Sequence, residues 1–95
     1  MNTTDEARLS QLSETAMEGK EDYCLLTDNT RVDFIWDSGI GVLSVKRKRQ
    51  ALTSQRANDI VAYWDSLGHY QIQALRVGNL VKTDWIMAVK NCEAG

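Results

Sequence analysis

The residues that could do chemistry are few, and their spacing matches no catalytic pattern. His69 is the only histidine, so the chain can build neither a His pair nor a His-rich metal site. Cys24 and Cys92 lie far apart and form no C-x-x-C pair, the spacing of zinc knuckles and of thioredoxin-like redox sites. A Cys–His nucleophile pair would require the fold to bring a cysteine to His69, and that alternative stays open.

Three aspartates offer a second kind of chemistry. Asp33 and Asp37 share one side of an expected strand, and Asp84 is a candidate for the same side of the sheet. Paired carboxylates can exchange protons with a substrate or hold Mg²⁺, but no pattern typical of a pocket surrounds these, and no glycine-rich phosphate loop occurs. We therefore expect solvated carboxylates, no catalytic residue, no metal or cofactor, no small-molecule substrate and no enzymatic activity.

The sharpest chemical feature is a basic run at residues 46–56. It holds five basic residues and no acid, whereas residues 1–22 hold six acids and two bases. Basic clusters bind phosphates because each neutralised phosphate releases counterions. The alternative interpretation is a solvated strand edge, or a cluster that the acidic first helix neutralises. The candidate nucleic-acid contacts are Lys46, Arg47, Lys48, Arg49 and Arg56.

Length and composition predict one small soluble domain over residues 1–95, with frayed ends at 1–4 and 91–95. The 95 residues are 43% hydrophobic and 25% charged, close to the balance of globular proteins, and the net charge is −2. No stretch approaches the roughly 20 apolar residues of a membrane helix, and the first residues lack a signal-peptide pattern. We expect a cytoplasmic protein with free thiols and no membrane contact.

Two helices must position these residues. The first is expected to begin at Thr3 or Thr4, and the second at Thr53 or Ser54, because these side chains can cap a helix start. Glycines at 19 and 68 suit the helix ends. The second helix has the stronger apolar periodicity, on Ala57, Ile60, Val61, Trp64 and Leu67.

Alternating residues from 23 to 47 predict three strands in an antiparallel meander. We place two-residue turns at Asp28-Asn29 and at Ser38-Gly39. These turns set Trp36 opposite Gly41 and bring one apolar set to a single buried face, with the pairs Leu25–Val32, Tyr23–Phe34, Phe34–Leu43 and Val32–Val45.

A C-terminal hairpin completes the expected fold. Its strands are residues 70–77 and 80–89, joined by Gly78-Asn79. The fold class is therefore α+β, an antiparallel sheet with two helices in the order α-β-β-β-α-β-β. The outward sheet face would carry a contiguous apolar patch, which usually marks an interface. Its expected members are Leu26, Ile35, Val42, Leu75, Val77, Leu80 and Ile86.

The order helix, three strands, helix, up to Leu67, resembles the topology of double-stranded RNA-binding domains. The basic cluster just before the second helix is similar to theirs. The resemblance covers about two-thirds of the chain and is one of topology alone. The sequence lacks a counterpart of the family's Gly-Pro loop between strands and its alanine-rich helix start, and the extra hairpin departs from the pattern.

These observations lead to two functional interpretations. The first is a non-catalytic protein-binding module, a small adaptor or inhibitor of the kind found among phage or mobile-element accessory proteins. It would bind a protein partner, itself as a homodimer, or both, through the apolar sheet face. The alternative is a nucleic-acid-binding protein that uses the basic run from Lys46 to Arg49.

Overall fold

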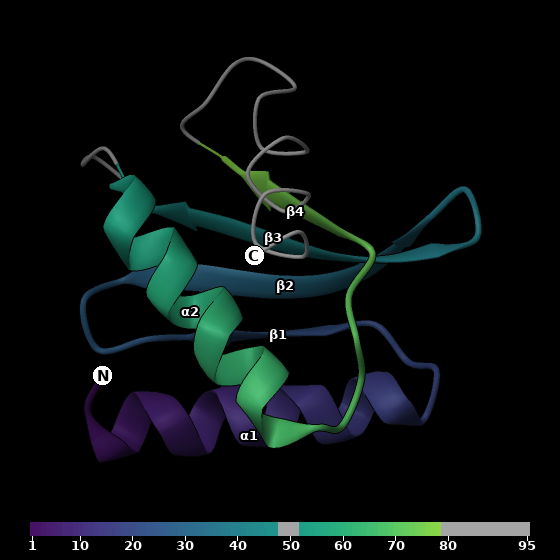
Figure 1. Ribbon diagram of the computed structural model, residues 1–95, viewed down its shortest axis with the longest axis horizontal. Coiled ribbons are helices and arrows are strands. Elements are labelled where there is room, and N and C mark those ends of the chain that lie inside the picture. The colour runs from purple at the N-terminus through teal and green to yellow at the C-terminus, as the bar shows by residue number, and fades with distance from the viewer. Residues whose placement is uncertain (48–51, 79–95) are drawn as a thin grey trace.

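A computed structural model describes residues 1–47 and 52–78, which form two helices and a four-stranded sheet (Figure 1). The α+β class is thus confirmed. Strand order across the sheet is β1-β2-β3-β4. The elements in chain order are α1 (Thr3–Met17), β1 (Asp22–Leu25), β2 (Thr30–Asp37), β3 (Ile40–Arg47), α2 (Ser54–Leu67) and β4 (Ala74–Val77).

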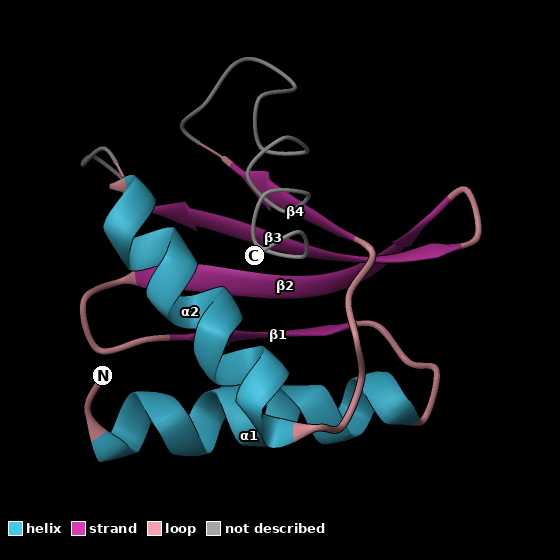
Figure 2. Ribbon diagram, viewed as in Figure 1, coloured by secondary structure: helices cyan, strands magenta, loops and turns pink. Residues whose placement is uncertain are grey.

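The sheet is mixed, so the prediction of a purely antiparallel sheet is wrong. β4 runs parallel to β3, with Leu43 opposite Leu75 and Val45 opposite Val77. The reason is the crossover through α2, which carries the chain back along the sheet before β4 begins (Figure 2). The second strand of the expected hairpin, residues 80–89 with Leu80 and Ile86, lies outside the described residues.

The turn between β1 and β2 has three residues, 27–29, instead of the predicted two. Leu26 donates its backbone N–H to the Thr30 carbonyl at 2.8 Å, and Asn29 has a positive φ of 68°. A tight turn followed by one left-handed residue is the common three-residue hairpin loop, and Asn tolerates that conformation. The extra loop residue shifts the β1 register by one position.

This shift exchanges the two faces of β1, so the side chains predicted to be buried point outward. Tyr23 lies opposite Asp33 and Leu25 opposite Arg31, where the predicted partners were Phe34 and Val32. Because neighbouring strand residues alternate between faces, Tyr23 and Leu25 point outward and are 49% and 51% exposed. Their predicted place in the core is taken by Leu26, with Cys24 packed against it.

The turn between β2 and β3 matches its prediction. Ser38 and Gly39 both have positive φ, and the predicted pairs Phe34–Leu43, Val32–Val45 and Trp36–Gly41 are present. Tyr70 covers Gly41 so closely that a Cβ added there would collide with the Tyr70 ring and hydroxyl oxygen.

Both helices bury their apolar stripes in one core on one face of the sheet, with α2 crossing the strands (Figure 1). Trp64 of α2 stacks on Phe34 at a ring distance of 6.2 Å. Leu26, Leu75 and Val77 belong to this core, so their predicted place on the outward face is wrong. The turn shift moves Leu26, and pairing with the core residues Leu43 and Val45 moves the other two.

Capping explains where the helices begin and end. Asn2 caps α1 by accepting the Asp5 backbone N–H at 2.8 Å, one residue before the predicted threonines. Thr53 caps α2 as predicted, and Gly68 ends it with a left-handed φ of 67°. Neither helix is long and apolar enough to cross a membrane, in the part of the chain that the structure describes.

Candidate functional site

The basic run is largely engaged in ion pairs where it is described. Arg47, at the end of β3, pairs with Asp28 at 2.5 Å, and Arg56, in the first turn of α2, pairs with Asp5 at 3.2 Å. Lys46 is exposed. Lys48 and Arg49 lie outside the described residues. Two of the five candidate phosphate contacts thus already face carboxylates.

Asp5 is the buried member of this network, with 1% of its surface exposed. Its carboxylate accepts the Thr27 backbone N–H at 2.8 Å, the Thr27 hydroxyl at 3.2 Å and Arg56 Nη2 at 3.2 Å. A buried charge is costly unless it is paired and hydrogen-bonded, and here both conditions are met. Asp5 therefore joins α1 to the β1–β2 turn and to α2.

Asp28 is the second carboxylate of the network. It accepts the Thr30 backbone N–H at 3.1 Å, and its Oδ2 lies 3.2 Å from Arg56 Nε. Burial alone would raise its pKa, but the hydrogen bonds from Thr30, the charge of Arg56 and the hydrogen bond from Arg47 outweigh it and lower the pKa from 3.8 to about 2. Asp5, Asp28, Arg47 and Arg56, called here the ion network, are neutral in sum.

A different set of side chains lies on the outward face of the sheet. Tyr23, Leu25, Arg31 and Asp33 come from two neighbouring strands and form a two-by-two arrangement, because Tyr23 pairs with Asp33 and Leu25 with Arg31. We call these four residues the β1–β2 block. The block presents an aromatic ring, an aliphatic side chain and one charge of each sign.

Arg31 is held in place within the block. Its guanidinium carbon lies 3.9 Å from the centre of the Tyr23 ring, and Nε and Nη2 donate to the Asp33 carboxylate at 3.0–3.1 Å. Stacking on an aromatic ring and two-pronged binding to a carboxylate are the geometries in which arginine is most ordered. The surface is therefore largely preformed.

Two other predicted patch residues are buried or partly buried, and one aspartate of the predicted pair is engaged in an ion pair. Val42 faces outward by register, yet only 1% of it is exposed, and Ile35 is partly buried. Asp37 pairs with Arg76 at 2.7 Å, so the structure does not bring Asp33 and Asp37 together as an acid–base pair. Asp84 lies outside the described residues.

Side chains already bind part of the outer edge of β1. Arg8 of α1 donates to the Leu25 carbonyl at 2.7 Å, and the Tyr23 backbone N–H is bound by its neighbour Asp22 at 2.8 Å. An edge strand whose free groups are capped is a poor template for strand addition. A partner would thus meet β1 through its side chains on the face.

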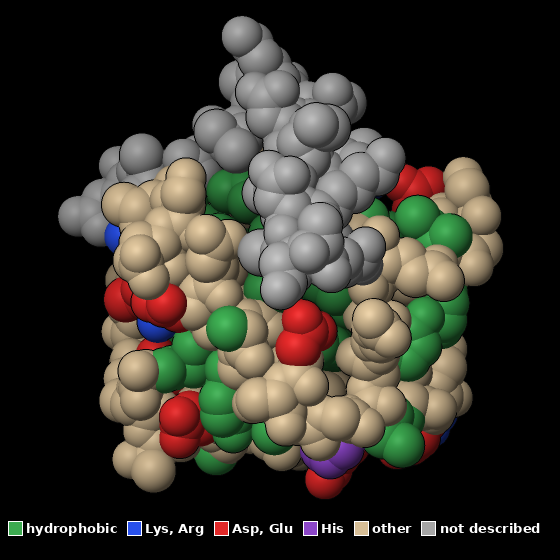
Figure 3. Space-filling view, viewed as in Figure 1, with side chains coloured by type: hydrophobic (Ala, Val, Ile, Leu, Met, Phe, Trp, Pro, Cys, Tyr) green, Lys and Arg blue, Asp and Glu red, His purple; other side chains and the backbone are tan. Residues whose placement is uncertain are grey.

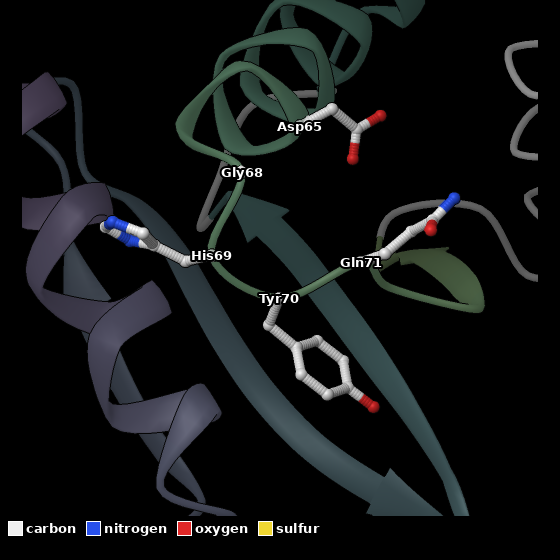
Figure 4. A pocket seen from close by; sticks show the side chains of 5 residues that line it. All are labelled: Asp65, Gly68, His69, Tyr70 and Gln71. Carbon is white, nitrogen blue, oxygen red and sulfur yellow. The ribbon is translucent and has the colours of Figure 1, made fainter.

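A hollow of about 460 Å³ lies where α2 ends, lined by Asp65, Gly68, His69, Tyr70 and Gln71. Its side chains diverge: His69 points to α1, Tyr70 to the strands, and Asp65 and Gln71 to the other side (Figure 4). His69 Nδ1 lies 2.6 Å from the hydroxyl of Ser13, which is fully buried. Because the hydroxyl is buried, this pair links α1 to the segment that follows α2 and does not present the serine to solvent.

Cys24 has the environment of a structural thiol. Burial raises its pKa from 9.0 to about 11 against the opposing charge of Arg8, so the thiol stays protonated at neutral pH. Cys92 lies outside the described residues. Within residues 1–47 and 52–78, no group of three or more His, Cys, Asp or Glu side chains could hold a metal ion.

Among the described residues, the face that carries α2 offers a mixture of hydrophobic, acidic and polar side chains, with lysine and arginine showing near its margins (Figure 3). Comparison of the chain with protein-family models, with curated proteins and with solved structures found no match.

Replacing Arg56 with Gln should lower the free energy of unfolding by about 1–3 kcal/mol, since Asp5 would lose its cationic partner while remaining buried. Urea unfolding followed by tryptophan fluorescence measures this. Lys20→Gln is the matched control, because the Lys20–Glu18 pair is 69% and 60% exposed, and it should change stability by less than about 0.5 kcal/mol. Equal effects of the two variants would contradict a structural ion network.

The low pKa of Asp28 predicts that acid lowers the free energy of unfolding over a defined pH interval. A carboxyl group with a pKa of about 2 when folded and 3.8 when unfolded stabilises the fold above pH 3.8, and that contribution disappears as the pH falls towards 2. The difference in unfolding free energy between wild type and Asp28→Asn should therefore shrink over this interval. A difference that stays constant from pH 5 to pH 2 would contradict the assignment.

Proposed function

We propose that this protein is a non-catalytic binding module that docks a protein surface on its β1–β2 block, as a small adaptor or inhibitor does. The observation that carries the proposal is the exposure of Tyr23 and Leu25, about half of each, beside an arginine that stacks on Tyr23 and pairs with Asp33. Tyrosine and arginine are enriched where protein interfaces gain most of their energy. Little conformational entropy remains to be lost when such a surface binds.

Nucleic-acid binding through the basic run is the weaker interpretation. Arg47 and Arg56 would have to leave Asp28 and Asp5 to reach phosphates, and Asp5 would then be a buried carboxylate without its cation. Asp28 also places a negative charge beside the end of β3. Phosphate binding would therefore compete with the ion network.

Site-specific photo-crosslinking in the cells that make the protein tests the proposal. A photo-reactive amino acid at position 23 should give a discrete protein adduct, and Leu25→Asp in the same chain should remove it, because a carboxylate would be buried at the interface. The same amino acid at position 17, where Met17 is 58% exposed on α1, is the control and should give no such adduct.

Three results would contradict the proposal. They are equal crosslinking from positions 17 and 23, an adduct at position 23 that survives Leu25→Asp, and an adduct that nuclease digestion removes. The last result would favour the basic run as the functional site.

A further inference from the structure

We infer that the surface docked on the β1–β2 block is the same block on a second copy of the chain. This inference rests on the proposed function and names its partner. The structure offers one geometric reason and one electrostatic reason for it, and both come from the pairing of β1 with β2.

The geometric reason is the arrangement of the block in two rows. One row is Leu25–Arg31 and the other is Tyr23–Asp33. Two sheets that stack face to face lie about 10 Å apart. A two-fold axis between the sheets, perpendicular to the strands and midway between the rows, places each row over the opposite row of the second copy. Tyr23 then meets Leu25 of the second copy, and Arg31 meets its Asp33.

The electrostatic reason is the balance of charge. The block has one cation and one anion, with 42% of the Arg31 side chain and 16% of the Asp33 side chain exposed. A strongly acidic or strongly basic partner would repel one of the two, whereas a second copy offers each its opposite. Each arginine keeps its own Asp33 and gains a second, so four alternating charges from the two β2 strands lie beside the two Tyr23–Leu25 contacts.

On this side of the molecule, two copies could also pair through the edge of β1, which is less favourable. The partly capped edge of β1 disfavours edge-to-edge pairing there, which favours the face as the place where two copies meet. The block is smaller than a standard protein interface, so we expect a reversible dimer with a dissociation constant of about micromolar or weaker.

Charge-swapped variants test the inference by sedimentation velocity at low salt over a wide concentration range. Arg31→Asp alone places acid over acid, and Asp33→Arg alone places base over base, so each should raise the dimer dissociation constant at least tenfold. An equimolar mixture of the two should regain the dimer, as should the double variant, whose charges are exchanged but again complementary. Lys20→Asp changes the net charge as Arg31→Asp does, at an exposed site outside the block, and should leave the dimer intact.

The outcomes separate the inference from the proposed function. A wild-type protein that stays at the 10.7 kDa mass of one chain, or single variants that still dimerise, would overturn the second copy as partner. If position 23 then crosslinks to a different protein, the proposed function stands and only its partner changes. Circular dichroism of each variant shows whether it is folded, and the double variant and the mixture distinguish lost complementarity from damage.

Discussion

The arrangement of this fold depends most on the hydrogen bonds and the ion pair that the buried carboxylate of Asp5 makes. Its burial is tolerable only while the Thr27 backbone and hydroxyl groups and Arg56 are all in place. Those donors come from the β1–β2 turn and from the start of α2. The requirement that they meet at one carboxylate fixes α1, the turn and α2 relative to one another and neutralises part of the basic run.

This constraint leaves one side of the sheet for binding. Because both helices pack in one core on a single face, the opposite face of β1 and β2 has neither helix over it. The three-residue turn then decides which side chains that face receives, since the shifted register turns Tyr23 and Leu25 outward. The turn that supplies Thr27 and Asp28 to the ion network is thus also the turn that creates the β1–β2 block.

Much of the fold could be predicted from local chemistry. Thr53, Gly68 and the Ser38-Gly39 turn determine the start and end of α2 and the β2–β3 register, and short-range rules were sufficient there. These rules failed at Asp28-Asn29, because this pair suits both a two-residue and a three-residue turn. Only the burial of the β1 side chains in the folded protein distinguishes the two turns. These short-range rules failed again at β4, because alternation within one strand does not show whether the neighbouring strand runs parallel or antiparallel to it. The β1–β2 block was not predicted because the turn at Asp28-Asn29 was taken as two residues long. The ion network was anticipated only as a neutralisation of the basic run by the first helix.

A concentration series of amide ¹H–¹⁵N spectra of the wild-type protein tests most directly whether the β1–β2 block is a docking surface for a second copy. The structure predicts that amide shifts of residues 22–25 and 30–35 move together with increasing concentration, while those of the α1 and α2 surfaces stay constant. Spectra that do not change with concentration, or changes centred on residues 46–56, would contradict it.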